Sequence, residues 1–267
     1  MEKIRCRLCE KEYEDKEMSD EHYPAHSVGN DDIVQLNVVK LFDVMMGENS
    51  DFKRYVTQEQ EKGKPLKESL DSFFDNELAE SIYPKGRTAR TLCQNCNRFL
   101  GKYDEAYLKF YDVDGDPKKV KGFQYKTKLQ IIKAIFAKFL SIPEVKDEKF
   151  DFIDFIRNPE ETEYRGKWSL YFVKRDASTD LMGLSDIPTG KIDWDLDGKK
   201  IVYELSDDKF IFNLLNFEKH DQFVMNNIFD ILSSYKLVEG CHDATGGYHG
   251  QLALTRLFKG MGNNPEE

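Results

Sequence analysis

The sequence of 267 residues predicts an α+β fold in two parts, a zinc-stapled N-terminal unit and a mixed α+β domain with an antiparallel sheet. Two Cys-x-x-Cys pairs, Cys6/Cys9 and Cys93/Cys96, predict the zinc staple. An amphipathic run followed by four short β-type runs predicts the second part. We expect the zinc unit to cover residues 1–115, with residues 31–90 as a helical insertion, and the second domain to cover residues 123–262.

Composition narrows the class of protein. The net charge of −10 and the pI of about 5.2 argue against binding of nucleic acid by the whole surface, although they permit a local basic strip. No segment reaches the roughly 18 consecutive apolar residues of a membrane span. The residues before Cys6 contain no apolar stretch typical of a signal peptide. We therefore expect a cytoplasmic protein without a membrane partner, whose paired cysteines bind metal rather than form disulfides.

Each Cys-x-x-Cys pair places two thiolates on one tight turn. Two such turns complete the tetrahedral shell of a structural zinc ion and leave no open position. The pairs are separated by 83 residues (10–92), which is long for a zinc ribbon. Loop closure costs little more as a loop lengthens, so a single shared zinc remains the expectation. The alternative is two reduced thiol pairs without a metal.

The zinc unit is expected to begin with a knuckle, a strand and a loop over residues 1–30. In the insertion, apolar residues at helical spacing predict helical structure over residues 33–44 and again over residues 66–78. The polar stretch 47–65 between them predicts irregular structure. A helix is expected to follow the second cysteine pair, from Asn97 to about Tyr111, and to end at an Asp- and Gly-rich turn.

The second part opens with an amphipathic helix over Lys126–Leu140, whose four lysines are expected on its solvated face. These are Lys126, Lys128, Lys133 and Lys138. A short helix is expected over residues 150–156 and another over 221–235. The expected strands are Ser169–Val173, Lys191–Trp194, Lys200–Leu205 and Phe210–Leu215, with a hairpin turn at Asp197-Gly198 between the second and the third.

Two blocks of sequence resemble the HNH endonuclease family. They are Glu21-His22-Tyr23-Pro24 with Gly29-Asn30, and Cys93-Gln94-Asn95-Cys96-Asn97 with Gly101. The resemblance is to the branch in which an acid–His–x–Pro box is flanked by Cys-x-x-Cys pairs, and it covers residues 4–30 and 91–106. It implies a ββα-metal fold in which His22 is the general base that activates water. It also implies that Glu21 and Asn97 bind a catalytic divalent ion. Asn30, Asn37 and Asn95 are the candidates for the middle asparagine of the family motif.

The chemistry of these side chains agrees with the implied roles. An unperturbed histidine has a pKa near about 6.5, so His22 can accept a proton from water near neutral pH. The oxygen ligands of Glu21 and Asn97 suit Mg²⁺ or Mn²⁺. A contribution from His26 would favour Mn²⁺, Ni²⁺ or Zn²⁺ instead. The competing interpretation is that His22 only caps a turn beside the zinc.

Basic residues flank both motif blocks and predict a local phosphate-binding strip. They are Arg5, Arg7, Arg87, Arg90, Arg98 and Lys102. Arg98 and Lys102 are four residues apart on the predicted helix and share a face, so we expect them to contact nucleic acid. A second group of ligand-type residues, Cys241, His242 and His249, surrounds a Gly-Gly turn. It fits a loop better than any metal motif.

Together these features predict a metal-dependent endonuclease of the HNH type that hydrolyses the phosphodiesters of nucleic acid, with DNA favoured over RNA as the substrate. Its expected cofactors are a structural Zn²⁺ and a catalytic Mg²⁺ or Mn²⁺. Because HNH proteins of this kind accompany defence or mobile-element systems, the resemblance implies an effector role there, with a partner protein or as a homo-oligomer. The alternative is a non-catalytic, zinc-stabilised binding module that acts with a partner protein.

Overall fold

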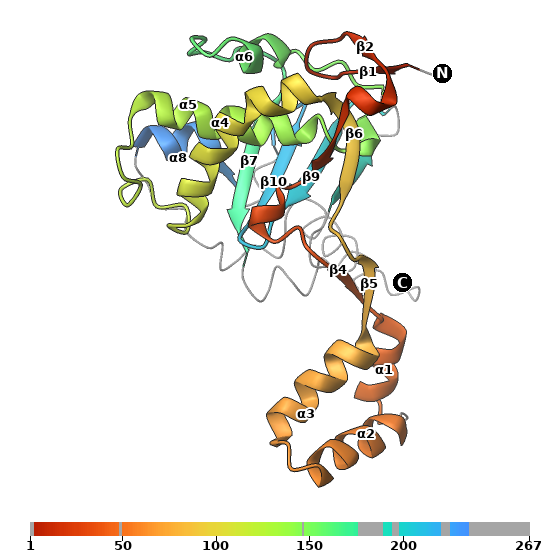
Figure 1. The fold of residues 1–267 in the computed structure, drawn as a ribbon. Helices are drawn as coiled ribbons and strands as arrows, with labels where there is room; N and C mark the ends of the chain where they lie inside the picture. Colours follow the sequence, from red (N-terminus) through yellow and green to blue (C-terminus); the bar gives the residue numbers. More distant parts are fainter. Residues whose placement is uncertain are drawn as a thin grey trace, which may run out of the picture.

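The computed structural model confirms an α+β fold, with helices packed on antiparallel sheets (Figure 1). The structure describes residues 3–47, 50–145, 147–175, 189–193, 198–219 and 225–234. Figure 1 shows a body that contains the larger sheet and its helices, and an arm that extends away from it. Within the described residues, none of the helices is long and apolar enough to cross a membrane.

The N-terminal unit is built around a hairpin followed by a helix. Strand β3 (Met18–His22) pairs antiparallel with β6 (Thr88–Cys93), and α4 (Gln94–Tyr111) begins immediately after β6. A smaller hairpin of β1 (Ile4–Arg5) and β2 (Glu12–Tyr13) precedes them and carries the first cysteine pair on its turn. The helix predicted after the second cysteine pair is confirmed, and it packs against both β3 and β6.

The insertion forms the arm of Figure 1. Its base is a two-stranded ribbon of β4 (Ile33–Leu36) and β5 (Ala79–Tyr83). Three helices follow β4: α1 (Val38–Met45), α2 (Ser50–Glu61) and α3 (Leu66–Phe73), and a π-helical turn, η3 (Phe74–Leu78), leads into β5. The sequence predicts helical structure from residue 33 onward. This start is wrong, because residues 33–36 form strand β4 and pair with β5, and the helix begins at Val38.

The prediction of irregular structure over residues 47–65 is also wrong, since α2 occupies most of this stretch. Most of its residues favour helix intrinsically, and three apolar side chains recur on one face. Phe52 and Tyr55 pack edge-on against Phe73 of α3, with ring centroids 5.0 and 5.3 Å apart. Val56 is buried in the same seam. Few but well-spaced apolar residues therefore suffice to dock a largely polar helix.

The larger sheet has five antiparallel strands in the order β11-β7-β10-β9-β8. Its strands are β7 (Ser169–Lys174), β8 (Thr189–Asp193), β9 (Ile201–Ser206), β10 (Phe210–Leu215) and β11 (Asn226–Asn227). The four predicted strands are thus present, and β8 pairs with β9 as the predicted hairpin requires. Asp197 of the predicted turn lies outside the described residues.

Helices cover one face of this sheet. They are α4, α5 (Tyr125–Phe139) and α8 (Ile228–Ser234), with α6 (Ile153–Arg157) beside α5. Alternate β10 side chains, Phe210, Phe212 and Leu214, point into this helical layer. The same core continues to Cys6 and Leu92 of the zinc unit. The division of the chain into two domains stays a prediction, but α4 and α5 pack along one another and join the two parts.

The lysines of α5 do not all lie on a solvated face, and that prediction is wrong. Lys133 is 1% exposed and donates hydrogen bonds to the carbonyls of Asn158 (2.7 Å) and Glu161 (2.8 Å). The Lys138 side chain is 12% exposed and binds two carboxylates. Helix α5 is enclosed by its neighbours on nearly every side, so these two lysines are buried and paired.

Candidate functional site

The four paired cysteines converge. Their Sγ atoms all lie within 4.8 Å of one another, although 83 residues (10–92) separate the pairs in sequence. A tetrahedron with Zn–S bonds of about 2.3 Å has S–S edges of about 3.8 Å, so the group fits a zinc ion. The backbone N–H of Cys93 also donates to Cys6 Sγ at 3.3 Å. The residues present therefore fit a structural metal, with Cys6, Cys9, Cys93 and Cys96 as its ligands.

The surroundings of the thiols affect their protonation. Burial raises the pKa of the Cys6 thiol. Burial also raises the pKa of Cys9, but the Tyr13 hydroxyl at 3.5 Å and other hydrogen bonds outweigh it and lower that pKa to about 7. A divalent ion at the centre would deprotonate all four thiols, because coordinating thiols lose their protons to the metal charge.

His22 is the last residue of β3, and its ring is half-buried. Its Nε2 atom lies 3.3 Å from the Lys85 carbonyl oxygen. The ring is also edge-on to His26, with centroids 5.5 Å apart. A carbonyl oxygen only accepts, so this contact requires a proton on Nε2.

Glu21 lies beside His22 on β3 but leaves the strand on the opposite face. It is 5% exposed and forms an ion pair through Oε1 with Lys138 of α5. Lys138 also binds Asp104 of α4, with Nζ 3.2 Å from Oδ2. Burial by itself lowers the pKa of the Lys138 ammonium, but Asp104 and Glu21 outweigh it and raise that pKa above its usual value. The result is a cluster of two carboxylates and one ammonium, in which Glu21 is buried and Asp104 is partly exposed.

Asn97 lies in the first turn of α4, where its side-chain amide donates to Ser19 Oγ at 2.7 Å. Ser19 precedes Glu21 by two residues on β3, so Asn97 faces the strand that carries the acid–histidine pair. In the part of the chain that the structure describes, only the four cysteines form a group of three or more converging His, Cys, Asp or Glu ligands. The structure thus brings Glu21, His22 and Asn97 to one hairpin and helix, each with a partner of its own.

Asn30 joins the loop after β3 to the start of β6. Its fully buried side chain donates to the carbonyls of Pro24 (2.7 Å) and Arg87 (3.0 Å) and accepts from the Arg87 N–H at 2.6 Å. Gly86 has a φ of +73°, and a Cβ there would lie 2.2 Å from the Asn30 carbonyl oxygen. Among the three asparagines considered from sequence, Asn30 is the one that fixes the ends of this hairpin.

The six basic residues around the unit divide into two groups. Four of them have partners within the protein. Arg5 pairs with Glu10, and Arg90 pairs with Asp15 and Asp20. Arg7 donates to the Leu140 and Ile142 carbonyls, and Arg87 is buried beside Tyr83. Arg98 and Lys102 are exposed on α4. Lys102 Nζ lies 4.2 Å from the centroid of the Phe99 ring, which leaves its ammonium at the surface.

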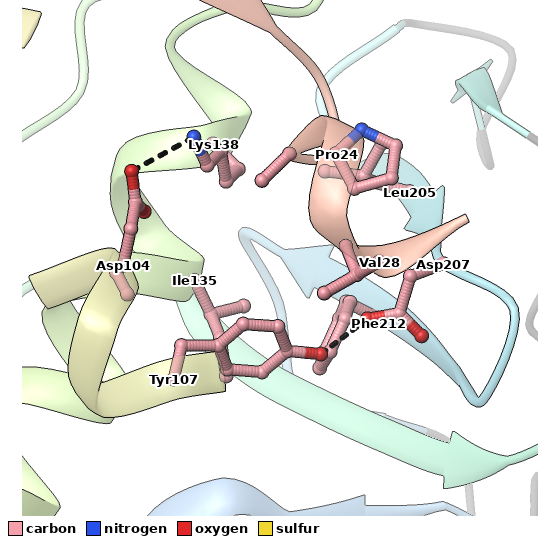
Figure 2. Close-up of a pocket in the computed structure, with 11 residues that line it drawn as sticks. Pro24, Val28, Asp104, Tyr107, Ile135, Lys138, Leu205, Asp207 and Phe212 are labelled. Carbon is pink, nitrogen blue, oxygen red and sulfur yellow. Dashed lines mark hydrogen bonds and ion pairs between the residues drawn. The ribbon is translucent and has the colours of Figure 1, made fainter. Parts of the chain in front are cut away.

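A small cavity lies behind the loop that follows His22 (Figure 2). Pro24 and Val28 of this loop face Lys138 and Asp104 across it, and Tyr107 and Asp207 lie at its other end. The Tyr107 hydroxyl donates to the buried Asp207 carboxyl group. Burial raises the pKa of Asp207 to about 7. The cavity behind the loop after His22 is therefore lined by residues from both halves of the chain.

Sequence reasoning missed the roles of Lys138, Asp104 and Asp207. Lys138 is 117 residues from Glu21 and 34 from Asp104, and Asp207 is 100 from Tyr107. Charged residues in an amphipathic helix or a turn are ordinarily solvated, so the sequence carried no signal for these contacts. The group Cys241, His242 and His249 lies outside the described residues. The chain matches no protein-family model, no curated protein and no solved structure.

Proposed function

We propose that this protein is a metal-dependent endonuclease of the HNH type that hydrolyses nucleic-acid phosphodiesters, with DNA as the preferred substrate. The observation that supports the proposal is the β3–β6–α4 unit closed by the four-cysteine group. It carries an acid–histidine pair on its first strand and an asparagine in the first turn of its helix. Two paired strands followed by a helix, formed by two blocks far apart in sequence, support the ββα arrangement that the resemblance implies.

His22 is the proposed general base. The Lys85 carbonyl oxygen holds Nε2 as a donor, so Nδ1 is the nitrogen that accepts a proton from the attacking water. Asn30 fixes the loop between Pro24 and Arg87, which positions the end of β3 where His22 lies. A base held by backbone contacts needs little reorganisation before proton transfer.

Glu21 and Asn97 are the proposed ligands of a catalytic Mg²⁺ or Mn²⁺. Lys138 pairs with Glu21 Oε1, and the Asn97 amide nitrogen donates to Ser19. In the described contacts, Glu21 Oε2 and Asn97 Oδ1 are therefore the atoms proposed to bind the ion. Mg²⁺ commonly uses one or two protein oxygens and completes its shell with water and substrate phosphate. Such an ion would supply charge that stabilises the leaving oxygen.

Arg98 and Lys102 are the proposed phosphate contacts. Both are exposed on α4 within the first three turns, next to Asn97. A net charge of −10 makes such local contacts necessary for a nucleic-acid substrate, because the remaining surface repels phosphate at long range.

The direct test is cleavage of supercoiled plasmid DNA with Mg²⁺ or Mn²⁺. We expect the wild-type protein to nick the plasmid and His22→Ala to lose at least about 100-fold in rate, as expected when a general base is removed. Lys109→Ala is the control, since Lys109 pairs with Glu105 on α4 and is not among the proposed site residues. Equal cleavage by wild type and His22→Ala would remove His22 from the mechanism, and absence of cleavage by wild type would oppose the nuclease proposal.

The second candidate function is a zinc-stabilised binding module without catalysis. The observation that favours it is the ion pair of Glu21 with Lys138, which already neutralises the proposed metal ligand. In this case the second ion would not bind, and the unit would serve to hold α4 and its exposed basic residues. Metal binding at Glu21 therefore separates the two functions.

A further inference from the structure

The large apolar side chains that remain exposed are concentrated in the arm. Eight such residues occur in the described part of the chain, and seven of them lie in residues 31–90. They are Val39, Phe42, Met46, Leu66, Leu70, Phe74 and Tyr83. The eighth, Tyr125, lies at the start of α5. Single exposed apolar residues are ordinary, but a cluster of this kind on one projecting element marks an interaction site.

The exposed residues follow helical spacing. Val39, Phe42 and Met46 recur at i, i+3 and i+7 along α1 and its C-terminal cap, which places them on one helix face. Leu66, Leu70 and Phe74 recur at i, i+4 and i+8 along α3 and its cap, and they also share one face. We call these six residues the arm stripes. Val39 and Met46 are each 73% exposed, so the α1 stripe in particular is open to solvent.

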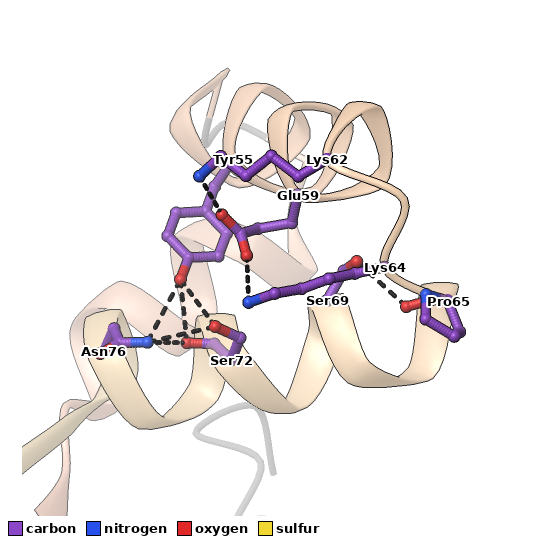
Figure 3. A network of polar contacts seen from close by, with 8 residues as sticks. All are labelled: Tyr55, Glu59, Lys62, Lys64, Pro65, Ser69, Ser72 and Asn76. Atoms are coloured by element: carbon purple, nitrogen blue, oxygen red, sulfur yellow. Dashed lines mark hydrogen bonds and ion pairs between the residues drawn. The ribbon is translucent and has the colours of Figure 1, made fainter.

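The arm stripes are additional to an interior that the arm already has. Phe73 packs against Phe52 and Tyr55 between α2 and α3. Polar contacts also connect these two helices and the loop between them (Figure 3). Glu59 pairs with Lys62 (2.6 Å) and Lys64 (2.5 Å), and Tyr55 bonds Ser72 at 3.0 Å. Because α2 and α3 are already held together, the outward stripes are not needed to build the arm.

Acidic side chains border the arm stripes. Asp43, Asp71 and Asp75 each follow a stripe residue directly in sequence, and all three are exposed. Lys67 is an exposed base beside the α3 stripe, whereas Lys40 of α1 is paired with Glu77 at 2.6 Å. The rim therefore carries an excess of negative charge. A second copy of this chain would bring this acidic rim against itself, which like-charge repulsion disfavours.

We propose that the arm stripes bind an amphipathic helix of a separate partner protein, with an apolar face and lysine or arginine on its flanks. A bound amphipathic helix presents apolar anchors at i, i+3, i+4 and i+7, and the exposed apolar side chains of the arm stripes offer them an apolar surface. Basic flanks would complement the acidic rim and increase the rate of association. The inference does not depend on the nuclease proposal, since it uses residues on the opposite side of the β4–β5 ribbon from the candidate site.

The test uses the full-length protein and a defined probe. The probe is a fluorescein-labelled 18-residue peptide of leucine and lysine, with leucine at helical i, i+3, i+4 and i+7 spacing. A matched peptide carries glutamate in place of lysine. Fluorescence anisotropy compares wild type with Phe42→Ser/Leu70→Ser, with Asp71→Asn/Asp75→Asn, and with Tyr125→Ser as the exposed-aromatic control outside the arm. Circular dichroism confirms that each variant is folded.

We expect the Phe42→Ser/Leu70→Ser variant to bind the leucine–lysine peptide at least about 10-fold more weakly than wild type, and Tyr125→Ser to bind it equally well. Asp71→Asn/Asp75→Asn should bind it several-fold more weakly, and the glutamate peptide should bind wild type at least about 10-fold more weakly. Equal binding by the Phe42→Ser/Leu70→Ser variant would overturn the inference. So would a wild-type dimer in light scattering that this variant abolishes, because a second copy would then cover the arm stripes.

Discussion

The zinc unit contains two sets of ligand-type side chains that differ in how they are held. The four cysteines lie on two local turns, and backbone contacts of the β1–β2 turn with β6 bring these turns together. Glu21 and Asn97 each depend on a partner: Glu21 pairs with Lys138 of α5, which also binds Asp104 of α4, and Asn97 donates to Ser19 of β3. The cysteine ligands are therefore brought together mainly by contacts within the unit, whereas Glu21 is held by a lysine from the second part of the chain.

Removal of one zinc ligand should have the largest effect. We expect Cys6→Ser to lose the metal and the β1–β2 and β3–β6 pairing, since structural zinc contributes about 10 kcal/mol or more in small zinc domains. Zinc content by mass spectrometry and far-UV circular dichroism measure the change. Cys241→Ser is the control and should retain one zinc per chain. Retention of full zinc by Cys6→Ser would mean that the four thiols do not share an ion.

Breaking the Glu21–Lys138 pair should be the next largest effect. Lys138→Met leaves two carboxylates without their ammonium in a buried site, which should destabilise the protein by about 3–5 kcal/mol. Urea denaturation measures this loss. Lys126→Met on the same helix is the matched control, because Lys126 is exposed. If both variants unfold at the same urea concentration, the acid–histidine region does not depend on α5 as described.

Asp207 should make stability depend on pH. Its folded-state pKa is raised to about 7 by burial, whereas the ordinary value is 3.8. Between these values the folded protein keeps a proton that the unfolded chain has lost, so this group lowers the free energy of unfolding as pH rises from about 4 to 7. Above pH 7 its effect is constant.

Asp207→Asn should remove this dependence, and its stability relative to wild type should rise by up to about 4 kcal/mol across that window. Asparagine can still accept from the Lys209 and Phe210 N–H groups, which keeps the turn in place. Urea denaturation of both proteins at several pH values measures the difference. Parallel curves for the two proteins would show that Asp207 ionises normally.

The smallest effect is expected for a surface charge at the proposed nucleic-acid face. Arg98→Ala should weaken DNA binding several-fold and lower the salt slope of binding by about one. Lys109→Ala is the control on the same helix, because Lys109 pairs with Glu105 at 2.8 Å. Anisotropy of labelled duplex DNA at several salt concentrations measures both. An identical loss in the two variants would indicate a general effect of charge.

Much of the fold could be predicted from local pattern. The α4 and α5 helices and four strands of the sheet follow their apolar periodicity closely. Helix α2 could not be predicted in this way, because only three apolar residues dock it and their partner Phe73 lies on another helix. Apolar periodicity identifies the buried face of a helix, but it does not identify the element against which that face packs.

The candidate site shows the same limit. The Cys-x-x-Cys pairs predicted their own convergence, since each pair fixes two ligands within one turn. The burial of Lys138 could not be predicted, because a lysine at regular spacing on a helix is ordinarily solvated. The run Ile131–Ala137 is almost wholly buried around Lys133, so α5 has no extended polar face to hold its lysines. The ion pair between Lys138 of α5 and Glu21 of β3 forms only in the tertiary structure.

Anomalous diffraction from crystals soaked with Mn²⁺ would show whether the acid–histidine region binds a second, catalytic ion. We expect a zinc signal at the four cysteines and a manganese signal bound by Glu21 Oε2 and Asn97 Oδ1, at distances of about 2.0–2.3 Å. A zinc signal alone, with Lys138 still paired to Glu21 and no manganese near Asn97, would contradict the catalytic assignment and favour the non-catalytic binding module.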